Sequence, residues 1–191
     1  MGIGANMTLG ANMTRPAVFL DRDGVINRAF IRCGMPFPPQ SVQDLEILHG
    51  VSDALVALKA HGYSIVVVTN QPDVARGTSS KEAIEGIHRR LEDELAIDAI
   101  LTCFHDDSAD CECRKPKPGL LLQAARDLGI DLSASFMVGD RWRDMEAGTR
   151  AGCRTFFVDR SYLERRPVAY DFRVGSLIEA STTILRPANS P

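Results

Sequence analysis

Short apolar runs recur along the chain and alternate with segments that have helical patterns. The runs lie at residues 17–20, 64–69, 97–102, 135–139 and 154–158. The intervening helical segments lie at residues 50–62, 79–95, 120–128 and 145–151. The second run, Ser-Ile-Val-Val-Val-Thr, is too apolar for a strand with one face in water, and it reads as a central parallel strand. The alternation predicts an α/β fold with a parallel sheet and right-handed crossovers. After Tyr170 the signal is weak, with a short last strand and a helix from Ser176.

Polar side chains follow these runs, at the ends where a parallel sheet binds its ligands. The residues concerned are Asp21 and Asp23 after the first run, Thr69, Asn70 and Gln71 at the second, Arg114 and Lys115 beyond the third, and Asp140 and Asp144 after the fourth. Because the carboxyl ends of parallel strands meet at one edge, we expect these side chains to gather there.

Asp21 and Asp23 lie one residue apart, directly after the first run. Alternate residues of an extended chain point to the same side, so both carboxylates can face one point. Like charges that close need a cation or a proton between them, and Mg²⁺ suits carboxylates, water and substrate phosphate. One carboxylate could then be a nucleophile and the other a general acid and base. The alternative is an ordinary Asp-x-Asp-Gly turn closed by Gly24.

The other strand ends offer groups that would neutralise a phosphoryl group. Asp140 is a third ligand for a hard cation, and Asp144 is a further ligand or a support, or only a partner of a helix dipole. Thr69 offers a hydroxyl and a backbone N–H, Lys115 a cation, and Arg114 a fork for carboxylate or phosphate. A strand-end cap at Thr69 and a solvated basic patch at 114–115 are the alternatives.

A second cluster has the composition of a metal site. Cys103, His105, Cys111 and Cys113 place four soft or borderline ligands within eleven residues. A Cys₃His set suits a closed tetrahedral Zn²⁺ site with a structural role. Reduced thiols in a surface loop are the alternative. An odd total of five cysteines does not indicate a disulfide framework.

Composition limits the remaining function classes. The 25 acidic and 22 basic residues give a net charge of −3, which gives no electrostatic case for binding nucleic acid or a membrane surface. No apolar run approaches the ~20 residues that span a bilayer, and the first residues do not resemble a signal peptide. We expect a cytoplasmic monomer with a disordered leader (1–14), a single domain (15–185) and a loose tail (186–191).

Four segments of the chain resemble the motifs of the haloacid dehalogenase-like (HAD-like) phosphatases. They are Asp21-Arg-Asp-Gly-Val-Ile, Thr69-Asn-Gln, Arg114-Lys-Pro-Lys-Pro and Gly139-Asp-Arg-Trp-Arg-Asp144. Order and spacing match from about residue 17 to 158. The resemblance is greatest to the D-glycero-D-manno-heptose 1,7-bisphosphate phosphatase and histidinol-phosphate phosphatase subfamily.

The resemblance implies a Rossmann-like three-layer sandwich and a role for each matching residue. It makes Asp21 the nucleophile, Asp23 the acid and base, and Thr69 and Lys115 stabilisers of the phosphoryl group. Mg²⁺ would be held by the Asp21 side chain, the Asp23 backbone carbonyl and Asp140, with Asp144 as a further candidate. The subfamily also places a zinc loop directly before its Arg-Lys-Pro motif.

Substrate recognition is less determined, because segments 28–36 and 71–77 differ from the subfamily's patterns and the zinc loop is short. The intervals 23–69 and 69–115 leave no room for a large cap domain, so loops 27–40, 71–77 and 103–114 would set specificity. The candidate substrate-binding residues are Asn70, Gln71, Arg76, Arg114 and Arg141. A phosphorylated heptose is the leading substrate, with histidinol phosphate or another small sugar phosphate next. A binding module that has lost turnover is the alternative from another class.

Overall fold

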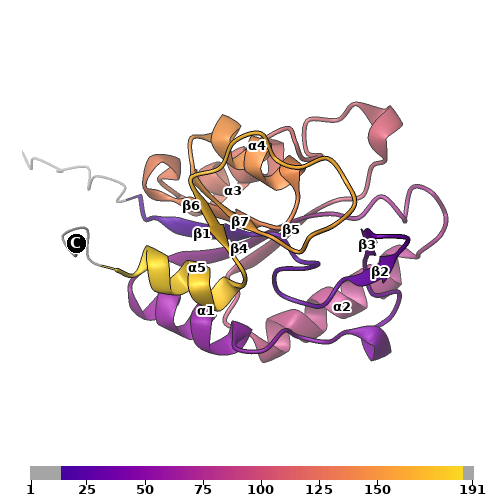
Figure 1. Ribbon diagram of the computed structural model, residues 1–191, viewed down its shortest axis with the longest axis horizontal. Coiled ribbons are helices and arrows are strands. Elements are labelled where there is room, and N and C mark those ends of the chain that lie inside the picture. Colours follow the sequence, from indigo (N-terminus) through magenta and orange to yellow (C-terminus); the bar gives the residue numbers. More distant parts are fainter. Residues whose placement is uncertain (1–13, 187–191) are drawn as a thin grey trace, which may run out of the picture.

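Six parallel strands form the central sheet, in the order β5-β4-β1-β6-β7-β8 (Figure 1). The computed structural model describes residues 14–186, so nearly all of the expected leader and tail lies outside the described residues. The strands are β1 (Ala17–Leu20), β4 (Ser64–Asn70), β5 (Ala99–Cys103), β6 (Phe136–Gly139), β7 (Arg154–Val158) and β8 (Phe172–Val174). β1 lies inside the sheet, between β4 and β6, and carries Asp21 directly after its last residue.

Helices cover both faces of the sheet, which confirms the expected three-layer sandwich (Figure 1). The α-helices are α1 (Val51–Ala60), α2 (Lys81–Glu94), α3 (Gly119–Leu128), α4 (Trp142–Ala151) and α5 (Leu177–Ile184). Three short 3-10 helices are η1 (Val42–Asp44), η2 (Asp107–Ala109) and η3 (Leu132–Ala134).

β1 shows how the two cores are divided. Its side chains alternate, with Val18 and Leu20 in the core formed with α1, α2 and α5. Ala17 and Phe19 belong to the core formed with α3 and α4. All four side chains are buried, as expected for a parallel strand with a helical layer on either side.

Most predicted elements form at the expected places. The strands at 17–20 and 154–158 have the predicted bounds, and α2 begins after Ser80, whose hydroxyl accepts a hydrogen bond from the Ala83 N–H. β5 begins two residues later than predicted, at Ala99. α4 begins at Trp142 and not at 145, because the Asp144 carboxylate accepts the Arg141 N–H and so closes the first turn.

Segment 27–40, expected to be a loop, contains a small antiparallel hairpin. It consists of β2 (Phe30–Arg32) and β3 (Met35–Phe37). Cys33 and Gly34 both have positive φ (50° and 75°), as a two-residue hairpin turn requires. Prolines argued against strands here, but a two-stranded ribbon outside the main sheet tolerates Pro36. The prediction of a plain loop was therefore wrong for residues 30–37.

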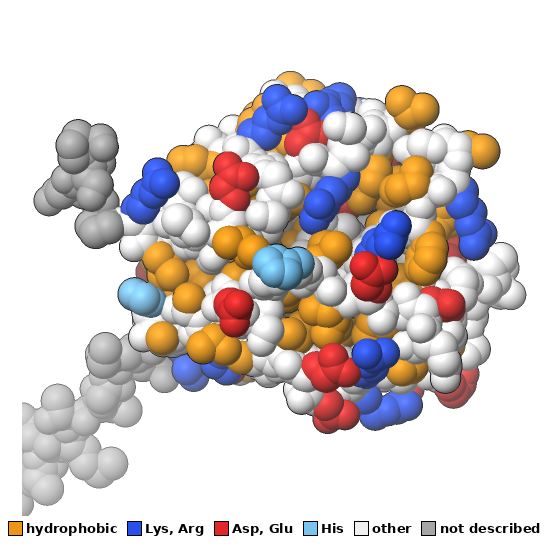
Figure 2. Space-filling view, turned by 60° about the horizontal axis from the view of Figure 1, so that its bottom comes forward, with side chains coloured by type: hydrophobic (Ala, Val, Ile, Leu, Met, Phe, Trp, Pro, Cys, Tyr) orange, Lys and Arg blue, Asp and Glu red, His pale blue; other side chains and the backbone are white. Residues whose placement is uncertain are grey.

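The described residues hold no large cap domain. Between β1 and β4 they form only the β2–β3 hairpin, η1 and α1, and between β4 and β5 only α2. No helix among residues 14–186 is long and apolar enough to cross a membrane. Acidic and basic side chains are interspersed on the face shown in Figure 2, as the balanced composition leads one to expect.

Gly148 gives a test of how closely α4 packs on the sheet. A Cβ added to Gly148 would lie 2.6 Å from Met137 Cβ and 2.9 Å from Thr155 Cγ2. We expect Gly148→Ala to lower the free energy of unfolding by about 1–3 kcal/mol, although alanine favours a helix. Denaturant unfolding measures this, with the exposed Thr149→Ala on the same helix as control. Unchanged stability of Gly148→Ala would contradict the close packing.

Candidate active site and metal centre

Three carboxylates meet at the ends of β1 and β6. Oxygens of Asp21, Asp140 and Asp144 lie within 4.8 Å of one another, and all three side chains are buried. Asp140 Oδ2 accepts a hydrogen bond from the Tyr162 hydroxyl at 2.7 Å. Asp140 Oδ1 is buried and has no hydrogen-bond partner among the described residues. A buried, unpartnered carboxylate oxygen beside two other carboxylates fits an oxygen-coordinated cation such as Mg²⁺.

Crowding of these carboxylates requires glycine at two neighbouring positions. Gly24 has a φ of +88°, and a Cβ there would lie 1.9 Å from Asp140 Oδ2. A Cβ on Gly139 would lie 2.2 Å from Asp144 Cβ. The Asp-x-Asp-Gly and Gly-Asp segments are therefore held together by close backbone approach as well as by charge.

The charge in this cluster is poorly balanced by protein groups. Burial raises the pKa of Asp21 to about 6; Lys115 opposes this shift, while Asp144 and Asp23 add to it. Burial and the neighbouring Asp21 and Asp144 also raise the pKa of Asp140 well above its usual value. One lysine thus faces three acids, which leaves an excess negative charge that a divalent cation would offset.

Lys115 is that lysine, and the structure fixes it closely. Its Nζ lies 2.7 Å from Asp21 Oδ1 and 2.6 Å from Asp144 Oδ1, and it donates to the Val68 carbonyl at 2.7 Å. Burial alone would lower the pKa of Lys115, but Asp144 and Asp21 outweigh it and raise that pKa to about 12. Asn70 bonds the Lys115 backbone with both ends of its amide, at 3.0 and 3.1 Å.

Asp23 lies beside this cluster, with its carboxylate turned to other partners. Arg22 donates to both of its oxygens, at 3.2 and 2.9 Å. Asn27 donates to Oδ1 and Gln71 to Oδ2, each at 2.9 Å. The Gln71 amide also donates to the Thr69 hydroxyl at 2.9 Å. Gln71 therefore joins two predicted catalytic residues, and its amide N–H groups are taken up by the protein.

A cleft of about 290 Å³ opens above these groups. Its lining includes Asp21, Thr69 and Lys115 from the strand ends and Met35 to Pro38 from the β2–β3 hairpin. The other cleft residues that bear on function are Asp23, Asn70, Arg76, Asp107, Arg114, Arg141, Arg143 and Asp144. The guanidinium of Arg141 is paired with Glu164, and its Nε lies 2.8 Å from Oε1 of that carboxylate.

Three arginines of the cleft converge on a single carboxylate, Asp107. Arg114 contacts it through Nε and Nη2 at 3.1 and 3.2 Å. Arg143 Nη1 lies 3.0 Å from Asp107 Oδ1, and Arg76 Nη2 lies 3.4 Å from Oδ2. Hydrogen bonding from Arg114 is the main cause that lowers the pKa of Asp107. We call Arg76, Arg114 and Arg143 the arginine cluster. Arg76 Nη1 also lies 3.6 Å from Oδ1 of Asp73 in the same cleft, so three arginines face two carboxylates and an excess of positive charge remains.

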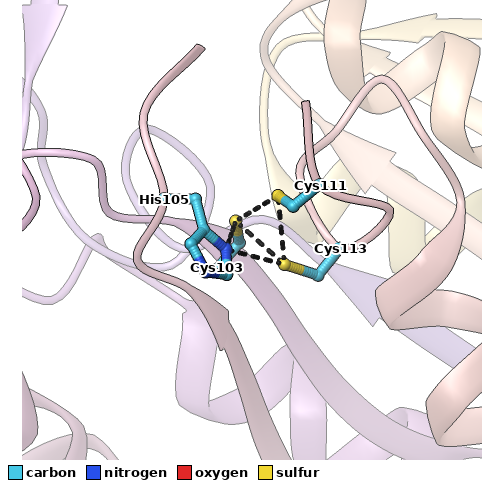
Figure 3. A group of neighbouring side chains, drawn as sticks. All are labelled: Cys103, His105, Cys111 and Cys113. Atoms are coloured by element: carbon cyan, nitrogen blue, oxygen red, sulfur yellow. Dashed lines mark hydrogen bonds between the residues drawn. The ribbon is translucent and has the colours of Figure 1, made fainter. Parts of the chain in front are cut away.

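The predicted zinc ligands come together in space, with their ligand atoms facing one another (Figure 3). Cys113 Sγ lies 3.2 Å from Cys103 Sγ, 3.4 Å from Cys111 Sγ and 3.3 Å from His105 Nδ1. Zn–S and Zn–N bonds of about 2.0–2.3 Å in a tetrahedron place the ligand atoms roughly 3.5–3.8 Å apart, so the set fits zinc. The loop also holds Arg114, which donates to the His105 carbonyl at 3.2 Å.

Several site residues were not found from the sequence. Tyr162 and Arg143 reach the carboxylates or the cleft through contacts between distant segments. Segments 27–40 and 103–114 were predicted to set specificity, and Met35 to Pro38 and Asp107 line the cleft, but the sequence did not single out these residues. Arg143 alone had a local signal, because it belongs to the Arg-Trp-Arg segment directly after Asp140.

The fold, the acidic cluster at its strand ends and the buried lysine define a HAD-like phosphatase, and comparison with known proteins agrees. A family model described as HAD-hydrolase-like matches residues 112–174. The D-glycero-beta-D-manno-heptose-1,7-bisphosphate 7-phosphatase of Photorhabdus laumondii is 40% identical over 150 residues, which cover 71% of this chain and 76% of the relative. The Escherichia coli K12 protein of the same name is 38% identical over 154 residues, covering 73% and 76% of the two chains.

A solved structure extends the likeness to the whole fold. The D,D-heptose 1,7-bisphosphate phosphatase of B. bronchiseptica, complexed with magnesium and phosphate, matches with a TM-score of 0.76. Its sequence is 30% identical, and the match covers 89% of this chain and 98% of that one. The chain belongs to the family of the D-glycero-beta-D-manno-heptose-1,7-bisphosphate 7-phosphatases.

The raised pKa of Asp21 predicts a pH dependence for the magnesium-free protein. An acid whose folded pKa is about 6 and whose unfolded value is 3.8 binds more protons in the folded state between these values. Stability is therefore lost as pH rises from about 4 to 6. We expect Asp21→Asn, which cannot ionise, to be more stable than the wild type by about 1–3 kcal/mol at pH 7 and about equal at pH 4.

Urea unfolding in magnesium-free buffer from pH 4 to 8 measures this difference. Asp127→Asn, at an exposed position of α3, is the control and should follow the wild type. A stability difference that is the same at pH 4 and pH 7 would contradict the assigned electrostatics.

Proposed function

We propose that the protein is a Mg²⁺-dependent phosphatase that removes the 7-phosphate of D-glycero-D-manno-heptose 1,7-bisphosphate through a phospho-Asp21 intermediate. The family membership, the carboxylate cluster and the cleft above it support this proposal. The monomeric state and the cytoplasmic location expected from the sequence remain predictions.

The reaction needs two steps that the chain's own residues can carry. In the first, an Asp21 oxygen forms a bond to phosphorus while the bond to the sugar oxygen breaks, and that oxygen takes a proton from Asp23. In the second, water gives a proton to Asp23 and attacks phosphorus, releasing phosphate and restoring the Asp21 carboxylate. Lys115 and Thr69 lie beside Asp21 in the cleft, where they could stabilise the transferred group.

Three groups of this chain would hold the metal. The Asp21 and Asp140 side chains and the Asp23 backbone carbonyl would hold Mg²⁺, with Asp144 as a further ligand or a support for Lys115. When bound, Mg²⁺ would neutralise charge on the phosphoryl oxygens.

The arginine cluster is the observation that carries the choice of substrate. The three guanidiniums share the carboxylate of Asp107, and Arg76 also pairs with Asp73, so the cluster keeps an excess positive charge and can accept a further anion at the rim of the same cleft. The second phosphate of a bisphosphate is such an anion. Histidinol phosphate has a cationic amine in the corresponding part of the molecule, and the arginines would repel it.

A substrate panel tests both the activity and the role of the arginine cluster. We expect wild-type protein with Mg²⁺ to hydrolyse a heptose 1,7-bisphosphate anomer faster than heptose 7-phosphate or histidinol phosphate. Asp21→Asn should abolish turnover. Arg143→Ala should lower kcat/KM for the bisphosphate roughly 10–100-fold, the value of one charged hydrogen bond, and change that for heptose 7-phosphate less than about 3-fold.

Arg126→Ala is the control, because Arg126 is exposed on α3 and does not line the cleft. Equal effects of Arg143→Ala on the bisphosphate and the monophosphate would argue against a second phosphate at the cluster. If histidinol phosphate were the best substrate, the protein would be assigned as a histidinol-phosphate phosphatase. An absence of turnover with every phosphomonoester would reject the phosphatase and favour a binding module.

We infer that Cys103, His105, Cys111 and Cys113 bind a structural Zn²⁺. The loop from 104 to 112 has few apolar side chains to form a core of its own, so four metal bonds would order it. Ordering the loop would fix Asp107, and would fix Arg114 through the His105 carbonyl. The zinc would thus act on substrate recognition without touching the substrate.

Metal analysis of cysteine variants tests this inference. Purified wild type should contain about one zinc per chain. Cys111→Ser should lose the zinc and unfold at a lower temperature, whereas the exposed Cys33→Ser should keep both zinc content and stability. Zinc-free wild-type protein with unchanged stability would reject the zinc site.

A further inference from the structure

Arg22 stands between the two proposed catalytic aspartates, yet its side chain is fully buried. All three of its guanidinium nitrogens make contacts. Nε and Nη2 donate to the two oxygens of Asp23, at 3.2 and 2.9 Å. Nη1 lies 3.1 Å from Nε2 of His88. The Asp23 side chain remains 16% exposed at the cleft, so the pair links the protein core to the cleft.

His88 comes from α2, which covers one face of the sheet, and it is 9% exposed. A guanidinium can only donate hydrogen bonds, so His88 Nε2 must accept with its lone pair, which requires a neutral ring. Burial, and then the charge of Arg22, lower the pKa of His88 to about 4. The ring is therefore neutral at physiological pH and able to accept from Arg22.

The three contacts fix the plane of the guanidinium, and the guanidinium fixes the plane of the Asp23 carboxylate. A planar fork bonded to both carboxylate oxygens allows little rotation. Without His88, the Nη1 N–H of Arg22 would be buried with no acceptor, which costs free energy. The guanidinium could lower that cost by rotating towards another acceptor, and it would then lose its bonds to Asp23.

We propose that His88 is a positioning residue for the proton transfers of Asp23, acting through Arg22. The inference rests on the proposed phosphatase function and extends it to a residue outside the cleft. Displacing a catalytic acid or base by about 1 Å can lower the reaction rate about 10²-fold, so a rigid support for Asp23 would keep the rate high.

Protonation of Asp23 is compatible with this support. Arg22, Asn27 and Gln71 together provide four donors to the carboxylate, so a protonated Asp23 must give up one of them. Gln71 can supply the exchange, because its Oε1 is buried without a partner among residues 14–186. Rotation of the Gln71 amide would turn this oxygen to accept the Asp23 proton while Arg22 stays in place.

The test uses two substrates that differ in their need for an acid. The sugar oxygen of heptose 1,7-bisphosphate must be protonated as it leaves, whereas p-nitrophenolate leaves readily without a proton. kcat/KM covers only the steps up to departure of the leaving group, and kcat also includes hydrolysis of the phosphoenzyme. The difference in kcat/KM between the two substrates therefore reports on Asp23 as an acid. The kcat for p-nitrophenyl phosphate reports on Asp23 as a base.

The variants are His88→Leu, which removes the acceptor, and His88→Gln, which restores one with its amide oxygen. We expect His88→Leu to lower kcat/KM for the heptose bisphosphate roughly 10–100-fold. For p-nitrophenyl phosphate, kcat/KM should change less than about 3-fold, whereas kcat should fall and a burst of p-nitrophenol should appear as phosphoenzyme accumulates. His88→Gln should recover most of the activity.

Two further variants guard against a merely structural explanation. Ile84→Val removes a buried methyl group one helical turn from His88 but leaves the His88 ring in place, so it should lower thermal stability without changing the ratio of kcat/KM for the two substrates. Arg22→Lys keeps the charge but loses the planar guanidinium that bonds both Asp23 oxygens. It should show the kinetic pattern expected of His88→Leu, and so it tests the same link if His88→Leu folds poorly.

A parallel loss of kcat/KM for both substrates, or no loss in either, would overturn the role of His88 in an active enzyme. Failure of His88→Gln to restore activity would overturn it as well. Wild-type protein that hydrolyses neither substrate would overturn the proposed function, and this inference with it.

Discussion

The buried carboxylate cluster is the constraint on which the rest of the site depends. Asp21, Asp140 and Asp144 come within 4.8 Å of one another in a region that water does not reach freely, and Lys115 is the cation that touches two of them. Such a cluster is costly without a further cation, so the protein must hold it by other means. Close packing at Gly24, the Asn70 clamp on the Lys115 backbone and the Tyr162 hydroxyl on Asp140 are those means.

Parallel strands bring the charged groups together, and the connecting segments determine how each one is held. Asp21 and Asp140 follow adjacent strands, β1 and β6, so their proximity is a direct consequence of sheet order. Lys115 arrives from a long connection after β5, and Asn70 at the end of β4 fixes its backbone. The proposed zinc ligands lie at the end of β5 and in the same connection, and the bond from Arg114 to the His105 carbonyl couples the order of that loop to the position of Arg114.

The sequence was sufficient for the sheet, the helices and the acidic end of the site, because these depend on local patterns and one topological rule. It could not identify contacts made between distant segments. Nothing local indicates that Tyr162 bonds Asp140, or that His88 on α2 reaches Arg22. The hairpin at 30–37 was missed because its prolines and glycine are typical of loops as well as of a short outer ribbon.

The cleft has an excess of negative charge at its base and of positive charge at its rim. This difference limits which substrates it can accept. Asp21, Asp144 and Lys115 line its base, and Asp140 lies beside them, so the excess of carboxylates favours a cation there. Its rim has three arginines against Asp107 and Asp73, and the remaining positive charge favours an anion. Asp107 keeps the arginines aligned when no ligand is present, and because it is half exposed it can yield contacts to an incoming phosphate. A substrate with one phosphate would use only the base of the cleft, whereas a bisphosphate can satisfy both ends at once.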